Sequence, residues 1–208
     1  MSRAELKAWA KEKIKGHIWD LIVPIIIASV LSSLTIGGSI TYNDGQLETK
    51  SGISVGLLFT FVQVGFAYFM IKFVNDKDHS LRDLFSFAKD FVRDFLVGLL
   101  QTVFIALWGL LLIVPGVIKS IAYSMVNIIL ADEKYNDLGF MDVLKKSEDM
   151  MQGHKMDYFL LELSFIGWHL LAVFTLGLLE IWIMPYYNTA CFKFLNDIKT
   201  EYEKANKA

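Results

Sequence analysis

The chain has 208 residues, of which 54% are hydrophobic, 14% aromatic and 20% charged, and its formal net charge at pH 7 is -2. This apolar content, with a positive mean hydropathy, is typical of membrane proteins. The net charge and the lack of a cluster of lysines and arginines among exposed aromatics exclude a basic nucleic-acid-binding surface. The single cysteine, Cys191, excludes an internal disulfide and a multi-cysteine metal site, and is interpreted as a small packing residue.

Six apolar segments approach the length of roughly 20 residues that a helix needs to cross a bilayer core of about 30 Å. They are Ile18 to Ile40, Val55 to Val74, Phe91 to Val114, Gly116 to Ala131, Tyr158 to Leu178 and Glu180 to Leu195. The fourth and sixth are short, and each follows its predecessor after a tight break, at Pro115-Gly116 and at Thr175-Leu176-Gly177, as in helical hairpins. The first two segments are joined by a polar loop, in which the glycines, Asn43 and Asp44 are typical of turns outside a bilayer.

An amphipathic segment with helical spacing precedes each pair of apolar segments. The positions on one face are Leu6, Trp9, Ala10 and Ile14, then Leu81, Leu84, Phe85 and Ala88, then Phe140, Val143, Leu144 and Ser147. These segments are too polar to span, and we expect interfacial helices that either anchor the bundle or contact anionic headgroups on the cytoplasmic side. The sequence therefore predicts one all-α membrane domain over residues 1–208, with three pseudo-repeats at about residues 2–74, 80–131 and 138–196.

An aspartate lies at the N-terminal end of the first apolar segment of each unit. Asp20 ends the stretch KGHIWD, Asp94 ends KDFVRD and Asp157 ends QGHKMD. A carboxylate there can accept hydrogen bonds from free backbone N–H groups and complements the positive end of the helix dipole. We interpret the three aspartates as helix caps, and Gly16 and Gly153 as the residues that let the chain leave the preceding helix.

The cationic residues predict the orientation in the membrane. All lysines and arginines except Lys50 and Lys119 precede the first apolar segment, lie near or after the end of the second, the fourth or the sixth, or lie at the start of the third. Cationic loops stay in the cytoplasm. We therefore expect both termini to be cytoplasmic.

Several stretches carry a family resemblance. LLLIVPGVIKSIAYSMVNIILAD, VLKKSEDMMQGHK, LSFIGW and TLGLLEIWIMPYYNTA together resemble a bacterial family of integral membrane proteins known as domain of unknown function 975. The resemblance covers nearly the whole chain and implies a multi-pass protein of the bacterial plasma membrane, with no established activity. The family is also distantly similar to the membrane domain that precedes some bacterial glycerophosphodiester phosphodiesterases, whose soluble phosphodiesterase domain is not found in this sequence.

The sequence contains none of the common catalytic or metal-binding motifs, such as H-E-x-x-H, G-x-S-x-G or C-x-x-C. His17 and His154 lie in turns before apolar segments and His79 lies in a polar loop, which favours structural or solvated roles. We therefore expect a protein that is not an enzyme and that needs no cofactor, metal or nucleic acid.

The candidate site consists of polar residues inside the apolar segments, because such groups are costly in lipid and face the bundle interior or a watery cavity. They are Lys119, Tyr123 and Asn127 at four-residue spacing, Glu162 and His169 seven residues apart, Gln63, and Gln101. The alternative is that they only bond helices together, or that Lys119 and Glu162 extend to the interfaces.

A specific ion pair follows from the predicted hairpins. Lys119 comes about one helical turn after the Pro115-Gly116 break, and Glu180 begins the sixth segment just after the other tight break. The two side chains are therefore expected at matching depth near the outer surface, and we predict that they pair.

The function expected from these features is non-catalytic. The protein would be a plasma-membrane module, surrounded by membrane lipids, that binds a partner protein or a lipid. The alternative is a small transporter or export accessory with a polar intramembrane cavity.

Overall fold

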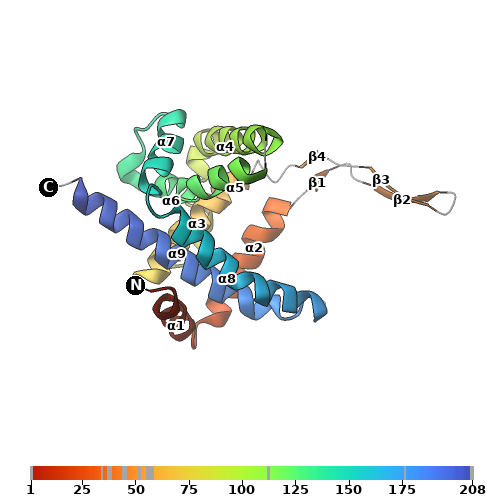
Figure 1. Ribbon diagram of the computed structural model, residues 1–208, viewed down its shortest axis with the longest axis horizontal. Helices are drawn as coiled ribbons and strands as arrows, with labels where there is room; N and C mark the ends of the chain where they lie inside the picture. The colour runs from red at the N-terminus through yellow and green to blue at the C-terminus, as the bar shows by residue number, and fades with distance from the viewer. Residues whose placement is uncertain are drawn as a thin grey trace.

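The structure is a computed structural model that describes residues 2–33, 35–36, 39–43, 46–50, 53–54, 59–111, 113–175 and 177–206. Its α-helices are α1 (Arg3–Lys13), α2 (Ile18–Ser33), α3 (Thr60–Val74), α4 (Phe91–Leu111), α5 (Ile113–Ala122), α6 (Val126–Leu130), α7 (Phe140–Met150), α8 (Lys155–Phe174) and α9 (Glu180–Ala205). Short 3-10 helices are η2 (Leu81–Phe85), η3 (Ala88–Asp90) and η4 (Glu133–Tyr135). Helices thus form the whole body of the molecule (Figure 1), which confirms the predicted helical architecture.

Two antiparallel strand pairs lie between α2 and α3, over the predicted polar loop and the last residues of the first predicted apolar segment. β1 (Thr35–Ile36) pairs with β4 (Ile53–Ser54), and β2 (Ser39–Asn43) pairs with β3 (Gln46–Lys50). In the second pair Ser39 lies opposite Lys50, and the strands extend away from the helical body (Figure 1). The predicted turn at Asp44 and the glycines of this loop lie outside the described residues.

Each predicted apolar segment contains an α-helix, but the helices differ in length, and the first segment is helical only to Ser33, since Thr35–Ile36 and the start of β2 form strands before its predicted end at Ile40. Within the described residues, two helical segments are long and apolar enough to cross a membrane, Leu81–Gly109 and Lys155–Phe174. A third is possible if α1 and α2, which meet at a bend of 103°, count as one. The lengths are therefore compatible with a membrane protein of two or three spans, and the six-span prediction goes beyond them.

The fourth apolar segment begins differently from the prediction. α5 starts at Ile113, so Pro115 and Gly116 belong to its first turn and do not form the break between the hairpin helices. Proline is tolerated there because the N–H that it lacks would have no helical partner. Gly116 allows close packing instead, since a Cβ on it would lie 2.7 Å from the Cα of Gly109 in α4.

The second amphipathic segment also differs from its counterparts. The first and third form α1 and α7, as predicted, whereas the second forms only η2 and η3. Ser80 and Asp83 close a short capping box at the start of η2. The backbone of η2 then lies directly on α3, where a Cβ on Gly65 would come within 2.1 Å of the carbonyl oxygen of Leu84. This close packing leaves the second unit without its predicted interfacial α-helix.

The core lies on both sides of α3, which packs against α2, α4, α6, α9 and η2. One cluster of buried side chains joins α2, α3 and η2, and includes Leu21, Phe69 and Leu84. The other joins α1 and α3 to the C-terminal helices, and includes the fully buried Phe165 and the buried Cys191. Cys191 is a free cysteine in this core, which confirms its predicted packing role.

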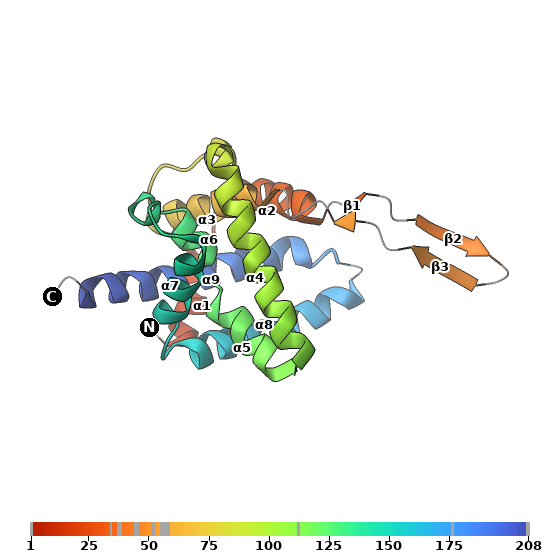
Figure 2. The ribbon, with the colours of Figure 1, turned by 90° about the horizontal axis from the view of Figure 1, so that it is seen from above.

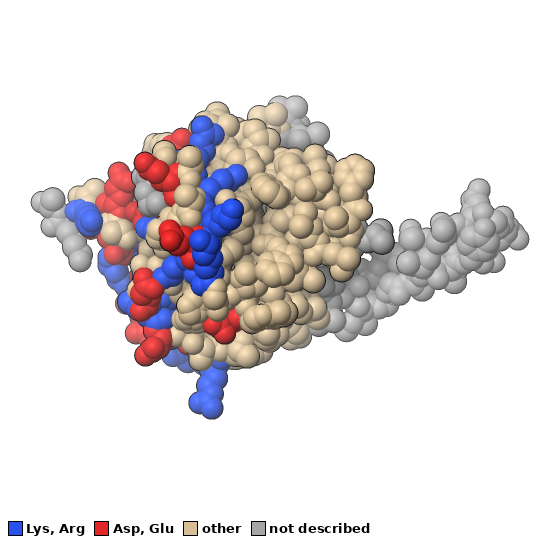
Figure 3. Space-filling view, turned by 90° about the horizontal axis from the view of Figure 1, so that it is seen from below, with Lys and Arg blue, Asp and Glu red and all other residues tan. Residues whose placement is uncertain are grey.

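Charged residues gather at one end of the molecule. On the face shown in Figure 3, the lysines, arginines, aspartates and glutamates form a band at one end, and the rest of the described surface carries few of them. Figure 2 places both chain ends on the side of this band and the strand pairs on the opposite side. The surface away from the band includes Val173 and Phe174, which are 71% and 85% exposed. A charged end followed by an apolar surface is compatible with membrane association.

Candidate functional site

A polar cavity of about 200 Å³ lies between α2, α3, α8 and α9. Its polar lining consists of Ser29 from α2, Gln63 from α3, His169 from α8, and Glu180, Tyr187 and Asn188 from α9. The apolar lining includes Phe66 and Met184. The four helices that meet here come from the first and the last of the three predicted units.

The charge in the polar cavity comes from the end of the α8–α9 hairpin. Nδ1 of His169 lies 2.8 Å from Oε1 of Glu180, and the His169 ring also packs edge-on against Tyr187, with ring centroids 5.5 Å apart. The two side chains remain 38% and 27% exposed. Among the described residues that line the cavity, Glu180 is the acidic residue and no lysine or arginine is present. The cavity therefore suits groups that donate hydrogen bonds or carry positive charge.

The two amides that line the polar cavity are each held by hydrogen bonds, Gln63 by α2 and Asn188 by its own helix. The Gln63 side chain donates to the hydroxyl of Ser32 and reaches the carbonyl oxygen of Ala28 at 3.5 Å. The Asn188 amide donates to the carbonyl oxygen of Met184 at 2.9 Å. Since an amide group also contains an acceptor oxygen, both residues keep hydrogen-bonding capacity for a ligand.

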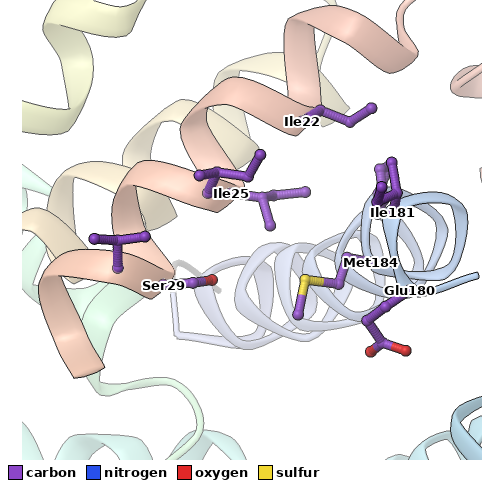
Figure 4. Close-up of a pocket in the computed structure, with 9 residues that line it drawn as sticks. Ile22, Ile25, Ser29, Glu180, Ile181 and Met184 are labelled. Carbon is purple, nitrogen blue, oxygen red and sulfur yellow. The ribbon is translucent and has the colours of Figure 1, made fainter. Parts of the chain in front are cut away.

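An apolar groove of about 270 Å³ continues from the polar cavity between α2 and α9, and we call it the α2–α9 groove. The two hollows share Ile25, Ser29, Glu180 and Met184. Figure 4 shows Ile22 and Ile25 of α2 facing Ile181 and Met184 of α9 across this groove. The combination of a polar cavity and an apolar groove matches the shape of an amphiphile, with a polar head and an apolar chain.

Glu162 belongs to the same helix pair but does not line the polar cavity. The hydroxyl of Tyr187 donates to Oε1 of Glu162 at 3.3 Å. Tyr187 itself lines the cavity and packs edge-on against Phe165, at 5.3 Å between ring centroids. Glu162 is thus connected to the cavity through Tyr187.

Lys119 lies elsewhere, and its predicted pairing with Glu180 is wrong. The structure pairs Lys119 with Glu148 of α7, whereas Glu180 pairs with His169. The reason is that α5 begins at Ile113. Lys119 is therefore further from the start of its helix than the prediction assumed, because the prediction counted from Pro115-Gly116. The Lys119 ammonium also lies 5.6 Å from the Trp108 ring centroid and 5.7 Å from that of Tyr123.

The α7 contact seals a break in the fourth apolar segment. α5 ends at Ala122 and α6 begins at Val126. The buried hydroxyl of Ser147 donates to the carbonyl oxygen of Ala122 at 2.7 Å, which satisfies a group that the break leaves free. Lys119 and Tyr123 therefore connect the end of α5 to Glu148 of α7 and do not line the polar cavity.

Two ionisable groups at the charged end have perturbed pKa values. Burial alone would raise the pKa of the Glu148 carboxyl, but the hydrogen bonds from Lys119 and Tyr123 outweigh it, so its pKa is lowered. Burial would also raise the pKa of the Asp132 carboxyl, but the hydrogen bond from Lys199 outweighs it, so this pKa is lowered as well. Both carboxylates thus act as ionised partners of lysines that hold loops and helices together.

The remaining candidates are dispersed. Gln101 on α4 and Asn127 on α6 are half-buried and do not line the polar cavity. The structure thus brings together Gln63 and His169 and links Glu162 to them through Tyr187. It keeps Lys119 and Tyr123 together beside Glu148, away from the cavity, and places Asn127 and Gln101 elsewhere.

The three aspartates lie in the first turns of α2, α4 and α8, where they complement the helix dipole. The predicted capping hydrogen bonds are not present among the described residues. Oδ2 of Asp20 lies 3.2 Å from Nδ1 of His17, Asp94 is buried with both oxygens unbonded, and the N-cap of α8 is His154, ahead of Asp157. The helix geometry explains this, because each aspartate lies inside the helix and not at the position before it.

Sequence reasoning missed Ser29, Tyr187 and Asn188 in the polar cavity and Glu148 beside Lys119. Ser29, Tyr187 and Asn188 are moderately polar residues inside apolar runs, and a signal for Tyr187 and Asn188 existed in the Pro-Tyr-Tyr-Asn stretch at 185–188. Glu148 lies in a segment that is polar throughout, so nothing in the sequence distinguishes it from its neighbours. The described residues also contain no group of three histidine, cysteine or acidic side chains placed to hold a metal ion.

Comparison with known proteins gives one family. The sequence pattern of the family described as "Protein of unknown function (DUF975)" matches residues 1–122 and residues 110–202. Neither the curated proteins nor the solved structures contain a match. The two matched ranges together cover almost the whole chain, and the protein therefore belongs to the DUF975 family.

Proposed function

We propose that this protein is a multi-pass protein of a bacterial cell membrane, with six spans and both termini in the cytoplasm. Three features support the proposal: six apolar segments that contain helices, a charged end that lies beside both termini (Figures 2 and 3), and the location of the lysines and arginines, Lys119 apart, outside the apolar segments or near their ends. In this arrangement the strand pairs and the α8–α9 turn lie on the outer side, and α1, α7 and the C-terminus lie on the cytoplasmic side.

The proposed role in the membrane is non-catalytic binding of an amphiphile. The observation that carries this proposal is the continuity of the polar cavity with the α2–α9 groove, through Ile25, Ser29, Glu180 and Met184. The polar head of the ligand would lie against Glu180, Gln63 and Asn188, and its chain would lie between α2 and α9. Since Glu180 supplies the charge, we expect a head that is cationic or rich in hydroxyl and amine donors.

A photoreactive long-chain amine tests this role on the full chain purified in a mild detergent. We expect cross-links on α2 and α9, and about tenfold less labelling in Glu180→Gln, because a hydrogen bond to a charged group is lost. Glu201→Gln, an exposed acid near the end of α9, is the matched control and should label as the unmodified protein does. Equal labelling of both variants, or cross-links spread over all helices, would contradict the proposal, as would a co-purified partner protein that occupies the same helices.

A small transporter is the second candidate, and the break between α5 and α6 favours it. Interrupted helices line the substrate sites of many transporters. Here, however, Ser147 of α7 and the ion pair between Lys119 of α5 and Glu148 of α7 lie at the break. Solute uptake or efflux in proteoliposomes that stops in His169→Ala and persists in Glu201→Gln would favour transport over binding alone.

A further inference from the structure

A second apolar groove, of about 400 Å³, lies between α5 and α8, and we call it the α5–α8 groove. Val114, Ile118 and Ile121 of α5 form one wall, and Met156 and Phe159 of α8 form the other. Val114 and Met156 are 67% and 65% exposed, so the groove opens onto the surface. At its closed end Ile121 is 7% exposed and belongs to the core. The groove shares no residue with the polar cavity or the α2–α9 groove.

The charge in the α5–α8 groove comes from Lys155, the first residue of α8. Within the described part of the chain Lys155 forms no ion pair, although it lies close enough to Glu148 to stabilise the charge of that carboxylate. Glu148 is already paired with Lys119. This end of the groove therefore has two ammonium groups and one carboxylate. Asp157, the nearest acid on α8, is two residues further on and so lies on another face of the helix.

The position of Lys155 sets the depth of this charge. α8 runs from the charged end of the molecule towards the opposite end (Figure 2), so Lys155 lies at the charged end and Phe159 lies one turn further into the apolar part. α5 runs the other way, and from Val114 to Ile121 it covers about 10 Å. One bilayer leaflet has a hydrocarbon depth of about 15 Å. The apolar walls therefore cover most of one leaflet, with an ammonium group at the headgroup level.

We propose that the α5–α8 groove binds one anionic phospholipid, with an acyl chain between α5 and α8 and the phosphate at Lys155. Charge complementarity selects this occupant, because a zwitterionic or cationic headgroup gains less from the net positive charge at the groove end. A second copy of the chain would have to bring an acidic group to the same point. The inference depends on the membrane location in the proposed function but not on the polar cavity.

Native mass spectrometry of the full chain in a mild detergent tests the site, with phosphatidylglycerol and phosphatidylcholine of identical chains as the two probes. We expect about fivefold tighter binding of phosphatidylglycerol, and loss of this preference in Lys155→Gln. Lys145→Gln is the matched control, because Lys145 is an exposed lysine at the same end of the molecule, on α7. Ile118→Trp should weaken binding of both lipids, whereas Leu170→Trp, on an exposed part of α8, should leave both unchanged.

Three results would overturn the inference. They are equal binding of both lipids by the unmodified protein, equal loss of preference in Lys155→Gln and Lys145→Gln, and a dimer mass that Ile118→Trp converts to a monomer mass. Thermal melts of each variant show that it is folded. A wrong membrane location would be recognised separately, because the protein would then be released from the membrane fraction without detergent. Failure of the amphiphile proposal also appears separately, because Glu180→Gln should not change the preference for phosphatidylglycerol.

Discussion

The two apolar grooves have similar walls and opposite charges. The α2–α9 groove ends at Glu180, which lies away from the charged end of the molecule and beside the polar cavity. The α5–α8 groove ends at Lys155, at the charged end, against the core residue Ile121. The acidic residue therefore belongs to the proposed outer side of the membrane and the basic residue to the cytoplasmic side.

This difference indicates how such grooves can select their ligands. Lipid chains are about as apolar as leucine or isoleucine side chains, so moving a chain from the bilayer into a groove changes the free energy little. A single charge near the headgroup region contributes on the order of 1 kcal/mol to the free energy of lipid binding, which is more than the apolar lining contributes. We infer that the apolar walls fix the position of a chain and that Glu180 and Lys155 decide which class of head is bound.

The largest expected effect concerns the assignment of the two sides. With Thr41→Cys in β2 and Lys146→Cys in α7, a membrane-impermeant maleimide should label position 41 in intact cells and position 146 only after the cells are opened. The native Cys191 is buried and should not react. Labelling of position 146 in intact cells would place Lys155 on the outer side and would contradict the six-span arrangement.

The next effect is a reversal of charge within each groove. Lys155→Glu changes the charge at the α5–α8 groove by two units, and we expect its preference between anionic and zwitterionic lipid to change by about thirtyfold. Glu180→Lys should have a comparable effect on binding of the long-chain amine. Native mass spectrometry with defined lipids measures the first change, and photolabelling measures the second.

The two grooves should respond independently to these reversals. Lys155→Glu should leave amine labelling unchanged, and Glu180→Lys should leave the preference for phosphatidylglycerol unchanged, because the grooves share no lining residue. Coupled changes in both readouts would show one continuous lipid site in place of two.

A smaller effect is expected when a groove is filled and its charge is kept. Ile118→Trp in the α5–α8 groove and Met184→Trp in the α2–α9 groove should each reduce binding in their own groove by about tenfold. Leu170→Trp is the control for both. An unchanged affinity in Ile118→Trp would show that the chain of the lipid does not lie between α5 and α8.

The parts of this fold that follow from the sequence are those with a periodic or compositional signal. The apolar runs predict the helices, and the positions of Gly16 and Gly153 predict the turns before α2 and α8, where both glycines have a positive φ. α1 and α7, which the sequence predicts as interfacial helices, have clear helical spacing. The second amphipathic segment has the same spacing but forms η2 and η3, because packing of Leu84 on Gly65 is a tertiary contact that the pattern does not contain.

The candidate site follows from the sequence only in part. Polarity inside apolar segments points to Gln63 and His169, which line the polar cavity, because a buried polar group needs a partner. It does not indicate which polar residues share a cavity, since α2 and α9 meet through contacts between residues more than a hundred positions apart. The Lys119–Glu180 prediction failed for a related reason: it took Pro115-Gly116 as the start of the helix, whereas α5 begins at Ile113.

The smallest expected effect lies beside the α5–α8 groove, in the Lys119–Glu148 pair. The two side chains are 26% and 31% exposed, so we expect each single change to glutamine to cost about 1 kcal/mol, or about 2 to 4 °C in melting temperature. The double change should cost less than the sum of the single changes, since each single variant already loses the pair. Strictly additive losses would show that the contact does not stabilise the protein.

The same pair predicts a pH dependence. The pKa of Glu148 is lowered in the folded protein from its ordinary value of 4.5, so its contribution is complete above that value and is lost as the pH falls through the lowered pKa. The difference in melting temperature between the unmodified protein and Glu148→Gln should therefore stay constant from about pH 8 to pH 5 and shrink at lower pH. Glu201→Gln provides the control, because that exposed acid forms no ion pair among the described residues. A difference that persists unchanged well below pH 4.5 would mean that the two side chains stabilise α7 by packing and not by charge.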